Sequence, residues 1–182
     1  MAQQDAIIAG GCFWCTEAIF KSLTGVIAIE SGYTGGQTDN PTYQQVCSGK
    51  TGHAEAIRIT FDPAVINYTD ILAVNFATHD PTQLNRQGND IGTQYRSAIF
   101  PINHEQYAEA EAAIALAQQA HSQPIVTTLE PFTDWYPAEA YHQDYWAGAG
   151  QQNGYCLAVI PAKLQKLQKK FADKLKSCPD TD

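Results

Sequence analysis

Hydrophobic and polar residues follow two periods along this chain, one of about two residues and one of three to four. Residues 56–61 alternate, with Ile57, Ile59 and Phe61 on one side, which is typical of a half-buried strand. Residues 12–23 place apolar side chains at helical spacing, which predicts a helix that stops at Gly25. Short apolar runs predict further strands at residues 5–11, 26–33, 96–102 and 125–129.

Capping residues and spacing indicate the other helices. Asn103, with Gln106 three residues later, has the form of an N-terminal cap for a helix that reaches about residue 120. Shorter helices are expected at 70–78 and 138–146. One stripe of a final helix is formed by Leu164, Leu167, Phe171 and Leu175. This order predicts an α+β fold, a two-layer sandwich in which helices pack against a small mixed β-sheet.

Two long polar segments separate these elements, the turn-rich residues 34–52 and the loop at 79–95. Loops of that length in a compact domain are often functional, so we expect them to form a site. The ordinary alternative for any single Asp, Asn or Gln in them is a solvated turn.

Composition narrows the class of protein. A chain of 182 residues, 44% hydrophobic and 16% charged, is expected to form one globular domain over residues 1–182. Six lysines against three aspartates in residues 161–182 predict a basic helical tail from about residue 161. The net charge of −8 argues against nucleic acid as a partner. The opening residues resemble neither a signal peptide nor a membrane span, so we expect a cytoplasmic monomer without a membrane partner.

Five cysteines in a reducing compartment are expected to be working thiols rather than structural bridges. Cys12 stands where a Gly-Gly turn passes into a helix, and the helix N-terminus should lower the pKa of its thiol. Cys15 lies one turn later on the same face and could form a C-x-x-C disulfide with Cys12. Zinc is not expected because no second ligand pair is present. Two alternatives stay open here: a general thiol–disulfide oxidoreductase and a non-enzymatic, thiol-rich metal-binding module.

Five sequence blocks provide more specific evidence on function. They are GCFW (11–14), SGYTGG (31–36), PTYQQVCSGKTGHAE (41–55), HDPTQLNRQGNDIGTQYRSAIF (79–100) and AEAYHQDYW (138–146). Together, and in this order, they resemble the peptide methionine-sulfoxide reductase A family. The resemblance implies an enzyme that reduces methionine S-sulfoxide in oxidised proteins, and also the free amino acid. It implies no cofactor, with thioredoxin as the external reductant.

The resemblance also assigns roles in the first chemical step. Cys12 would attack the sulfoxide sulfur and be left as a sulfenic acid. Glu55 would donate a proton to the departing oxygen, which requires a raised pKa of the kind that a dry pocket produces. Tyr43 and Tyr95 match residues that hydrogen-bond the oxygen, and Asp90 matches a supporting residue. The wall for the substrate methyl group would consist of Phe13 and Trp14.

The thiol that resolves the sulfenic acid is less closely defined. Cys156, in the segment NGYC, matches the recycling cysteine of many members and is our first expectation, with a Cys12–Cys156 disulfide. Cys15 is an alternative, at a position where many members have glycine, and Cys178 could relay the disulfide outward. We expect Cys47 to be a buried bystander, as free cysteines commonly are.

Overall fold

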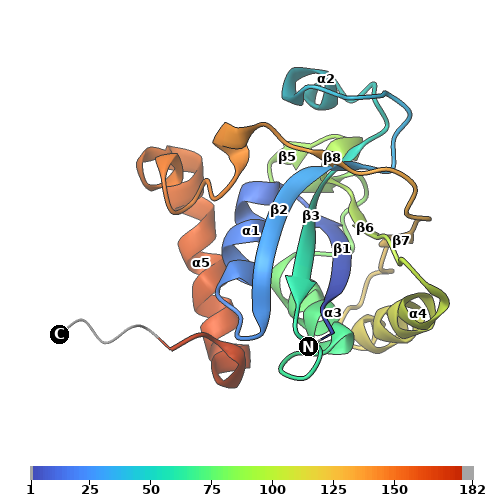
Figure 1. Ribbon diagram of the computed structural model, residues 1–182, viewed down its shortest axis with the longest axis vertical. Coiled ribbons are helices and arrows are strands. Elements are labelled where there is room, and N and C mark those ends of the chain that lie inside the picture. The colour runs from blue at the N-terminus through green and yellow to red at the C-terminus, as the bar shows by residue number, and fades with distance from the viewer. Residues whose placement is uncertain (1, 178–182) are drawn as a thin grey trace.

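A six-stranded mixed β-sheet forms the centre of the computed structural model, which describes residues 2–177 (Figure 1). The strand order is β7-β6-β1-β3-β2-β8; β6 and β7 run parallel, and the other neighbours run antiparallel. The strands are β1 (Gln4–Gly10), β2 (Val26–Thr34), β3 (Ala54–Phe61), β6 (Ser97–Ile99), β7 (Thr128–Leu129) and β8 (Tyr136–Pro137). A separate hairpin consists of β4 (Arg86–Gln87) and β5 (Asp90–Ile91). The predicted mixed sheet is confirmed.

Helices pack against this sheet, as the sequence predicts. They are α1 (Phe13–Lys21), α2 (Tyr43–Cys47), α3 (Tyr68–Thr78), α4 (His104–Gln118) and α5 (Gly154–Phe171). Single 3₁₀ turns are η1 (Thr93–Tyr95), η2 (Ala140–His142), η3 (Ala149–Gln152) and η4 (Ala172–Lys174). The helix α5 lies alongside α1, and α4 packs on α3 (Figure 1). Within residues 2–177, no helix has the length and hydrophobicity that crossing a bilayer requires.

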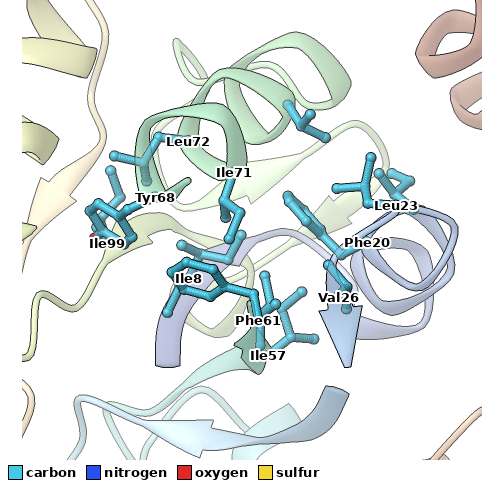
Figure 2. Packing of buried hydrophobic residues seen from close by; sticks show 14 of the residues in the cluster. Ile8, Phe20, Leu23, Val26, Ile57, Phe61, Tyr68, Ile71, Leu72 and Ile99 are labelled. Carbon is cyan, nitrogen blue, oxygen red and sulfur yellow. The ribbon is translucent and has the colours of Figure 1, made fainter. Parts of the chain in front are cut away.

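The main core lies between the sheet and α1 and α3. Strand residues such as Ile8 and Ile57 point toward Phe20 of α1 and Ile71 of α3, and all four side chains are almost fully buried (Figure 2). The strict alternation in β3 places Ile57, Ile59 and Phe61 in this core, because successive strand residues face opposite sides of a sheet. The opposite face is covered by loop residues that precede β8, so in the described part of the chain the helical layer lies on one side of the sheet.

Several predicted boundaries are wrong. Residues 138–146 do not form a helix but contain the single 3₁₀ turn η2. The turn-rich segment 34–52 contains α2, which begins at a capping box between Thr42 and Gln45. The predicted strand at 96–102 shrinks to β6, because Pro101 lacks an N–H and residues 102–103 form a bend before α4. The predicted N-cap of α4 is confirmed, since the Asn103 side chain accepts a hydrogen bond from the Gln106 backbone N–H at 2.8 Å.

The final helix begins earlier and ends earlier than its leucine stripe predicts. Asn153 caps it by accepting a hydrogen bond from the Cys156 N–H at 3.1 Å, so α5 starts well before residue 161. Pro161 lies inside the helix rather than at its boundary. Leu175 lies beyond the helix and pairs with Leu23 in an isolated β-bridge. The basic tail is therefore the second half of α5 and the residues that follow it.

Candidate active site

The junction between β1 and α1 places Cys12 at the N-terminus of a helix. Gly11 has a φ of +94°, and a Cβ atom at this position would lie 2.8 Å from Gln87 Cγ, so only glycine fits without strain. The chain then reaches Cys12, the N-cap residue of α1. The Cys12 carbonyl accepts hydrogen bonds from the backbone N–H groups of Cys15 and Thr16, at 3.1 and 3.3 Å. The sequence therefore predicts this turn-to-helix junction correctly.

Glu55 comes from β3 and faces the first turn of α1. Its Oε1 accepts a hydrogen bond from the Phe13 backbone N–H at 3.2 Å. Its Oε2 is buried and has no hydrogen-bond partner among residues 2–177. Burial raises the pKa of Glu55 to about 8, although the Phe13 N–H partly opposes this. The carboxyl group is therefore mainly protonated at neutral pH, with one oxygen available to donate.

Three thiols lie in one buried cluster between α1 and α5. Cys12, Cys15 and Cys156 pack there with Ala18 and Ile160, and Cys12 is the most accessible of the three at 8% exposure. This thiol cluster brings together the expected nucleophile and two of the three expected resolving thiols. The third, Cys178, lies outside the described residues.

The prediction of a lowered pKa for Cys12 is wrong. A hydrogen bond with Cys15, burial and the nearby charge of Glu55 all raise the pKa of Cys12, and together they outweigh the helix N-terminus. The same hydrogen bond lowers the pKa of Cys15, against the effect of burial. This contact therefore favours ionisation of Cys15 over ionisation of Cys12. Burial raises the pKa of Cys156 to about 11.

An aromatic cup lies beside the thiol cluster. The Trp14 indole stacks on Tyr145 with ring centroids 4.0 Å apart, and its N–H donates to His142 Nδ1 at 3.0 Å. The His142 ring lies against Phe13 and Tyr43, with centroid distances of 5.2 and 4.3 Å. Phe13 is fully buried and Trp14 half-buried, so Trp14 forms the open side of this cup. His142 and Tyr145 are contact residues that the sequence reasoning missed.

Glu139 ties the cup to the sheet. Its carboxylate accepts hydrogen bonds from the hydroxyls of Tyr33 and Tyr141, at 3.1 and 3.2 Å. It also accepts from the Tyr43 backbone N–H at 3.2 Å, which fixes the start of α2 over the site. Its partners come from β2, α2 and η2, so the signal for this role lies in tertiary contacts rather than in a local motif.

The remaining predicted residues lie on α2, β5 and η1, which surround the same centre. Burial, followed by the charge of Glu55, raises the pKa of Tyr43 and of Tyr95, so both phenols stay protonated hydrogen-bond donors. Asp90, on β5, accepts a hydrogen bond from the Tyr155 hydroxyl. The Tyr155 oxygen also lies 3.9 Å from Cys15 Sγ, which links Asp90 to the thiol cluster. Tyr155 is a further residue that the sequence reasoning missed.

Cys47 differs from its prediction. It is exposed at the end of α2, not buried, and hydrogen-bonds the side chains of Tyr43 and Tyr95. The helix α2 has five residues and buries only Val46, which leaves the next side chain outside. In the described part of the chain, no cluster of three or more His, Cys, Asp or Glu side chains could hold a metal ion.

The family model for peptide methionine sulfoxide reductase matches residues 4–175 of this chain. The chain belongs to this family. It is an enzyme with peptide methionine sulfoxide reductase activity. A peptide methionine sulfoxide reductase MsrA from Erwinia tasmaniensis is 70% identical over 172 residues, covering 94% of this chain and 97% of the relative. The MsrA of Deinococcus radiodurans is 54% identical over 177 residues, covering 96% and 85%.

Solved structures of the family share the fold. The reduced form of Mxr1 from Saccharomyces cerevisiae superposes with a TM-score of 0.80 at 33% identity, over 85% of this chain and 89% of the yeast chain. Methionine sulfoxide reductase A of Corynebacterium diphtheriae gives a TM-score of 0.72, also at 33% identity, over 80% and 74%. The family resemblance of the five sequence blocks is thereby confirmed.

Proposed function

We propose that the enzyme reduces methionine S-sulfoxide, in proteins and as the free amino acid, with Cys12 as nucleophile. The Cys12 thiolate attacks the sulfoxide sulfur, the S–O bond breaks, and the oxygen ends on Cys12 as a sulfenic acid while methionine leaves. The observation that carries this proposal is the buried, unpaired Oε2 of a mainly protonated Glu55 in the site. That oxygen is suited to donate the proton that the departing sulfoxide oxygen requires.

The aromatic cup and the phenols would hold the substrate. Trp14 and Phe13 provide an apolar surface for the S-methyl group, and Tyr43 and Tyr95 donate hydrogen bonds to the sulfoxide oxygen. Charge that develops on this oxygen is stabilised by donors already in place, which is a large term in enzyme catalysis. Asp90 supports the site through its hydrogen bond from Tyr155.

A second thiol then removes the sulfenic acid as an intramolecular disulfide. Cys156, our first expectation, and Cys15 both lie in the thiol cluster, which supports a resolving step within it. Thioredoxin is proposed to reduce the disulfide. Yeast Mxr1, whose reduced form aligns at 33% identity, has also been solved in complex with Trx2.

The test is a single turnover of Cys12→Ser with methionine S-sulfoxide. We expect no methionine to be released, whereas the wild-type enzyme should release one equivalent without a reductant. The R epimer serves as the control substrate and should stay unreacted in both. Methionine release by Cys12→Ser at the wild-type rate would refute the assignment.

A general C-x-x-C thiol–disulfide oxidoreductase is the competing function for the same residues. It requires Cys15→Ser to be as damaging as Cys12→Ser in the first turnover, and it requires reduction of insulin disulfides. We expect Cys15→Ser to retain the first turnover, because Cys15 takes no part in the attack on the sulfoxide.

A further inference from the structure

The helix α2 carries Tyr43 but has almost no core of its own. It contains five residues, lies at the periphery of the molecule and buries only Val46 (Figure 1). A helix this short is not stable by itself, because fixing the first helical turn is unfavourable. Its position must therefore depend on contacts at its two ends. Glu139 provides the first contact, by accepting a hydrogen bond from the Tyr43 backbone N–H.

A buried glutamine provides the contact at the other end of α2. The Gln94 side chain is 4% exposed, and its Nε2–H donates a hydrogen bond to the Cys47 backbone carbonyl at 3.2 Å. Gly92 leaves room for this amide, because a Cβ atom there would lie 2.2 Å from Gln94 Oε1 and displace it. Cys47 is the last residue of α2, so the hydrogen bond fixes the C-terminal end of this helix.

Gln94 belongs to η1, the turn that also carries Tyr95. This turn packs on β3. Directly after it, the Arg96 guanidinium donates to both oxygens of the Glu130 carboxylate, at 2.8 and 2.9 Å. The turn η1 is therefore fixed to the body of the protein, and the hydrogen bond from Gln94 fixes α2 relative to η1.

We propose that Gln94 is a positioning residue for the sulfoxide oxygen, because it sets the position of the Tyr43 phenol relative to the Tyr95 phenol. This inference rests on the proposed function, in which both phenols donate to that oxygen, and it adds the group that makes them converge. Cys47 supports the arrangement, since its thiol hydrogen-bonds both phenols while its carbonyl accepts from Gln94. Such donors are most effective when they are in place before charge develops on the oxygen.

The experiment replaces Gln94 by methionine, which nearly keeps the length and volume of the side chain but removes the donor. Gln106→Met is the matched control. The Gln106 side chain is 3% exposed, and its Nε2–H donates to the Asp5 carbonyl at 2.7 Å. Its Oε1 accepts from the Ile102 N–H, and neither partner is a candidate site residue. Both substitutions leave a buried carbonyl without its donor, so both should lower the unfolding temperature.

Each variant reacts in a single turnover with methionine S-sulfoxide, without reductant, over a range of sulfoxide concentrations. For Gln94→Met we expect methionine release at saturation to be about tenfold slower, because a misplaced phenol stabilises the transition state less. The sulfoxide concentration at half the maximal rate should change less than the rate does, since charge on the oxygen grows toward the transition state. Gln106→Met should stay within about twofold of the wild-type rate, a small change in activation free energy.

A second background separates positioning from a general structural effect. In Tyr43→Phe the hydroxyl that Gln94 is proposed to position is absent, so adding Gln94→Met should slow methionine release by less than about a further twofold. Gln94→Leu removes the same donor with a different shape and should give the same two factors.

Three results would overturn the inference. They are the wild-type rate in Gln94→Met, an equal loss of rate in Gln106→Met, or the same factor for Gln94→Met in the wild-type and Tyr43→Phe backgrounds. Failure of the proposed function would look different, because Cys12→Ser would then still release methionine. Unfolding midpoints above the assay temperature show that the rates belong to folded protein.

Discussion

Glu55 and Cys12 compete for one proton in a buried site. The charge of Glu55 raises the pKa of Cys12, so the thiolate is favoured while the carboxyl group keeps its proton. The pKa of Glu55, raised to about 8, therefore serves two purposes at neutral pH. The carboxyl group remains a proton donor, and it does not repel the thiolate.

Glu55→Gln tests the donor directly. The amide keeps the shape and can still accept from the Phe13 N–H, but it cannot supply the acid proton. We expect kcat to fall by about 10²-fold or more, the usual contribution of general acid catalysis. The wild-type rate should decline as the pH rises through about 8, and this decline should be absent in the variant. Initial rates from pH 6 to 10 provide the measurement.

Glu17→Gln is the matched control, because Glu17 is another buried carboxyl group with a raised pKa. Its oxygens accept from the Asp144 N–H and the Ser31 hydroxyl. This substitution should leave kcat within about threefold of wild type, on the scale of a small transition-state change. An equal loss of kcat in both variants would contradict the role of Glu55.

The same raised pKa makes stability depend on pH. A carboxyl group with a folded pKa of about 8 and an unfolded pKa of about 4.3 stabilises the fold below the lower value. This contribution is lost progressively as the pH rises to about 8 and stays lost above it. Glu55→Gln should therefore unfold at a higher temperature than the wild type at pH 9, with a smaller difference at pH 5. Calorimetry at the two values checks this, and no widening of the difference would contradict it.

At the residue scale, the sequence identified the groups that we propose to react but not their surroundings. Short motifs that can be matched to the family contain Cys12, Glu55, Tyr43 and Tyr95. His142 acts through a contact with Trp14, 128 residues away along the chain. No local pattern predicts such a contact. The raised pKa of Cys12 could not be foreseen for the same reason, since it results from tertiary burial.

At the element scale, the junction of β1 and α1 decides where Cys12, the proposed nucleophile, lies. The sequence predicted this junction, the strands around it and the cap of α4, because glycine, alternation and capping are local signals. It did not predict α2 or the true start of α5. Both begin at caps inside polar segments that lack a long hydrophobic repeat. At residues 138–146 the sequence predicted a helix that does not form, because the aromatic residues there contribute to the aromatic cup instead of lining one face of a helix.

Gly11→Ala tests that junction. The substitution places a Cβ at a φ of +94° and 2.8 Å from Gln87 Cγ, so both backbone strain and a clash arise. We expect a loss of about 1–3 kcal/mol in the free energy of unfolding, together with a marked fall in activity. Gly88→Ala is the control, because its φ is +59° but a Cβ there meets nothing within 4 Å. Equal losses of stability in the two variants, measured by denaturant unfolding, would contradict the close approach of Gln87.

At the scale of the whole molecule, α5 packs the basic C-terminal part of the chain against α1 and the main core. Leu167 is 1% exposed and belongs to the main core, so the second half of α5 is part of the same packed unit. Composition predicted one domain but left the place of this helix open, because its surface is largely charged. The contact between α5 and α1 is tertiary, so no local sequence pattern predicts it.

Leu167→Ala should therefore destabilise the entire domain by about 2–5 kcal/mol, the range for a buried leucine. The variant should still unfold in a single transition, at a lower midpoint than the wild type, with α5 unfolding together with the rest of the domain. Leu157→Ala, on the same helix but 48% exposed, should cost well under about 1 kcal/mol. Circular dichroism and tryptophan fluorescence should give coincident transitions in all three proteins. Two separated transitions would show that α5 folds independently.

The sheet ends on both sides in very short strands. Both β7 and β8 contain two residues, and β8 includes Pro137, which has no N–H to offer a neighbouring chain. A foreign extended polypeptide therefore finds almost no free backbone ladder to extend. Oxidised substrate proteins often expose sticky, partly unfolded segments, and an enzyme that handles them risks co-aggregation. The short edge strands of this sheet should therefore limit edge-to-edge pairing between the enzyme and such unfolded segments.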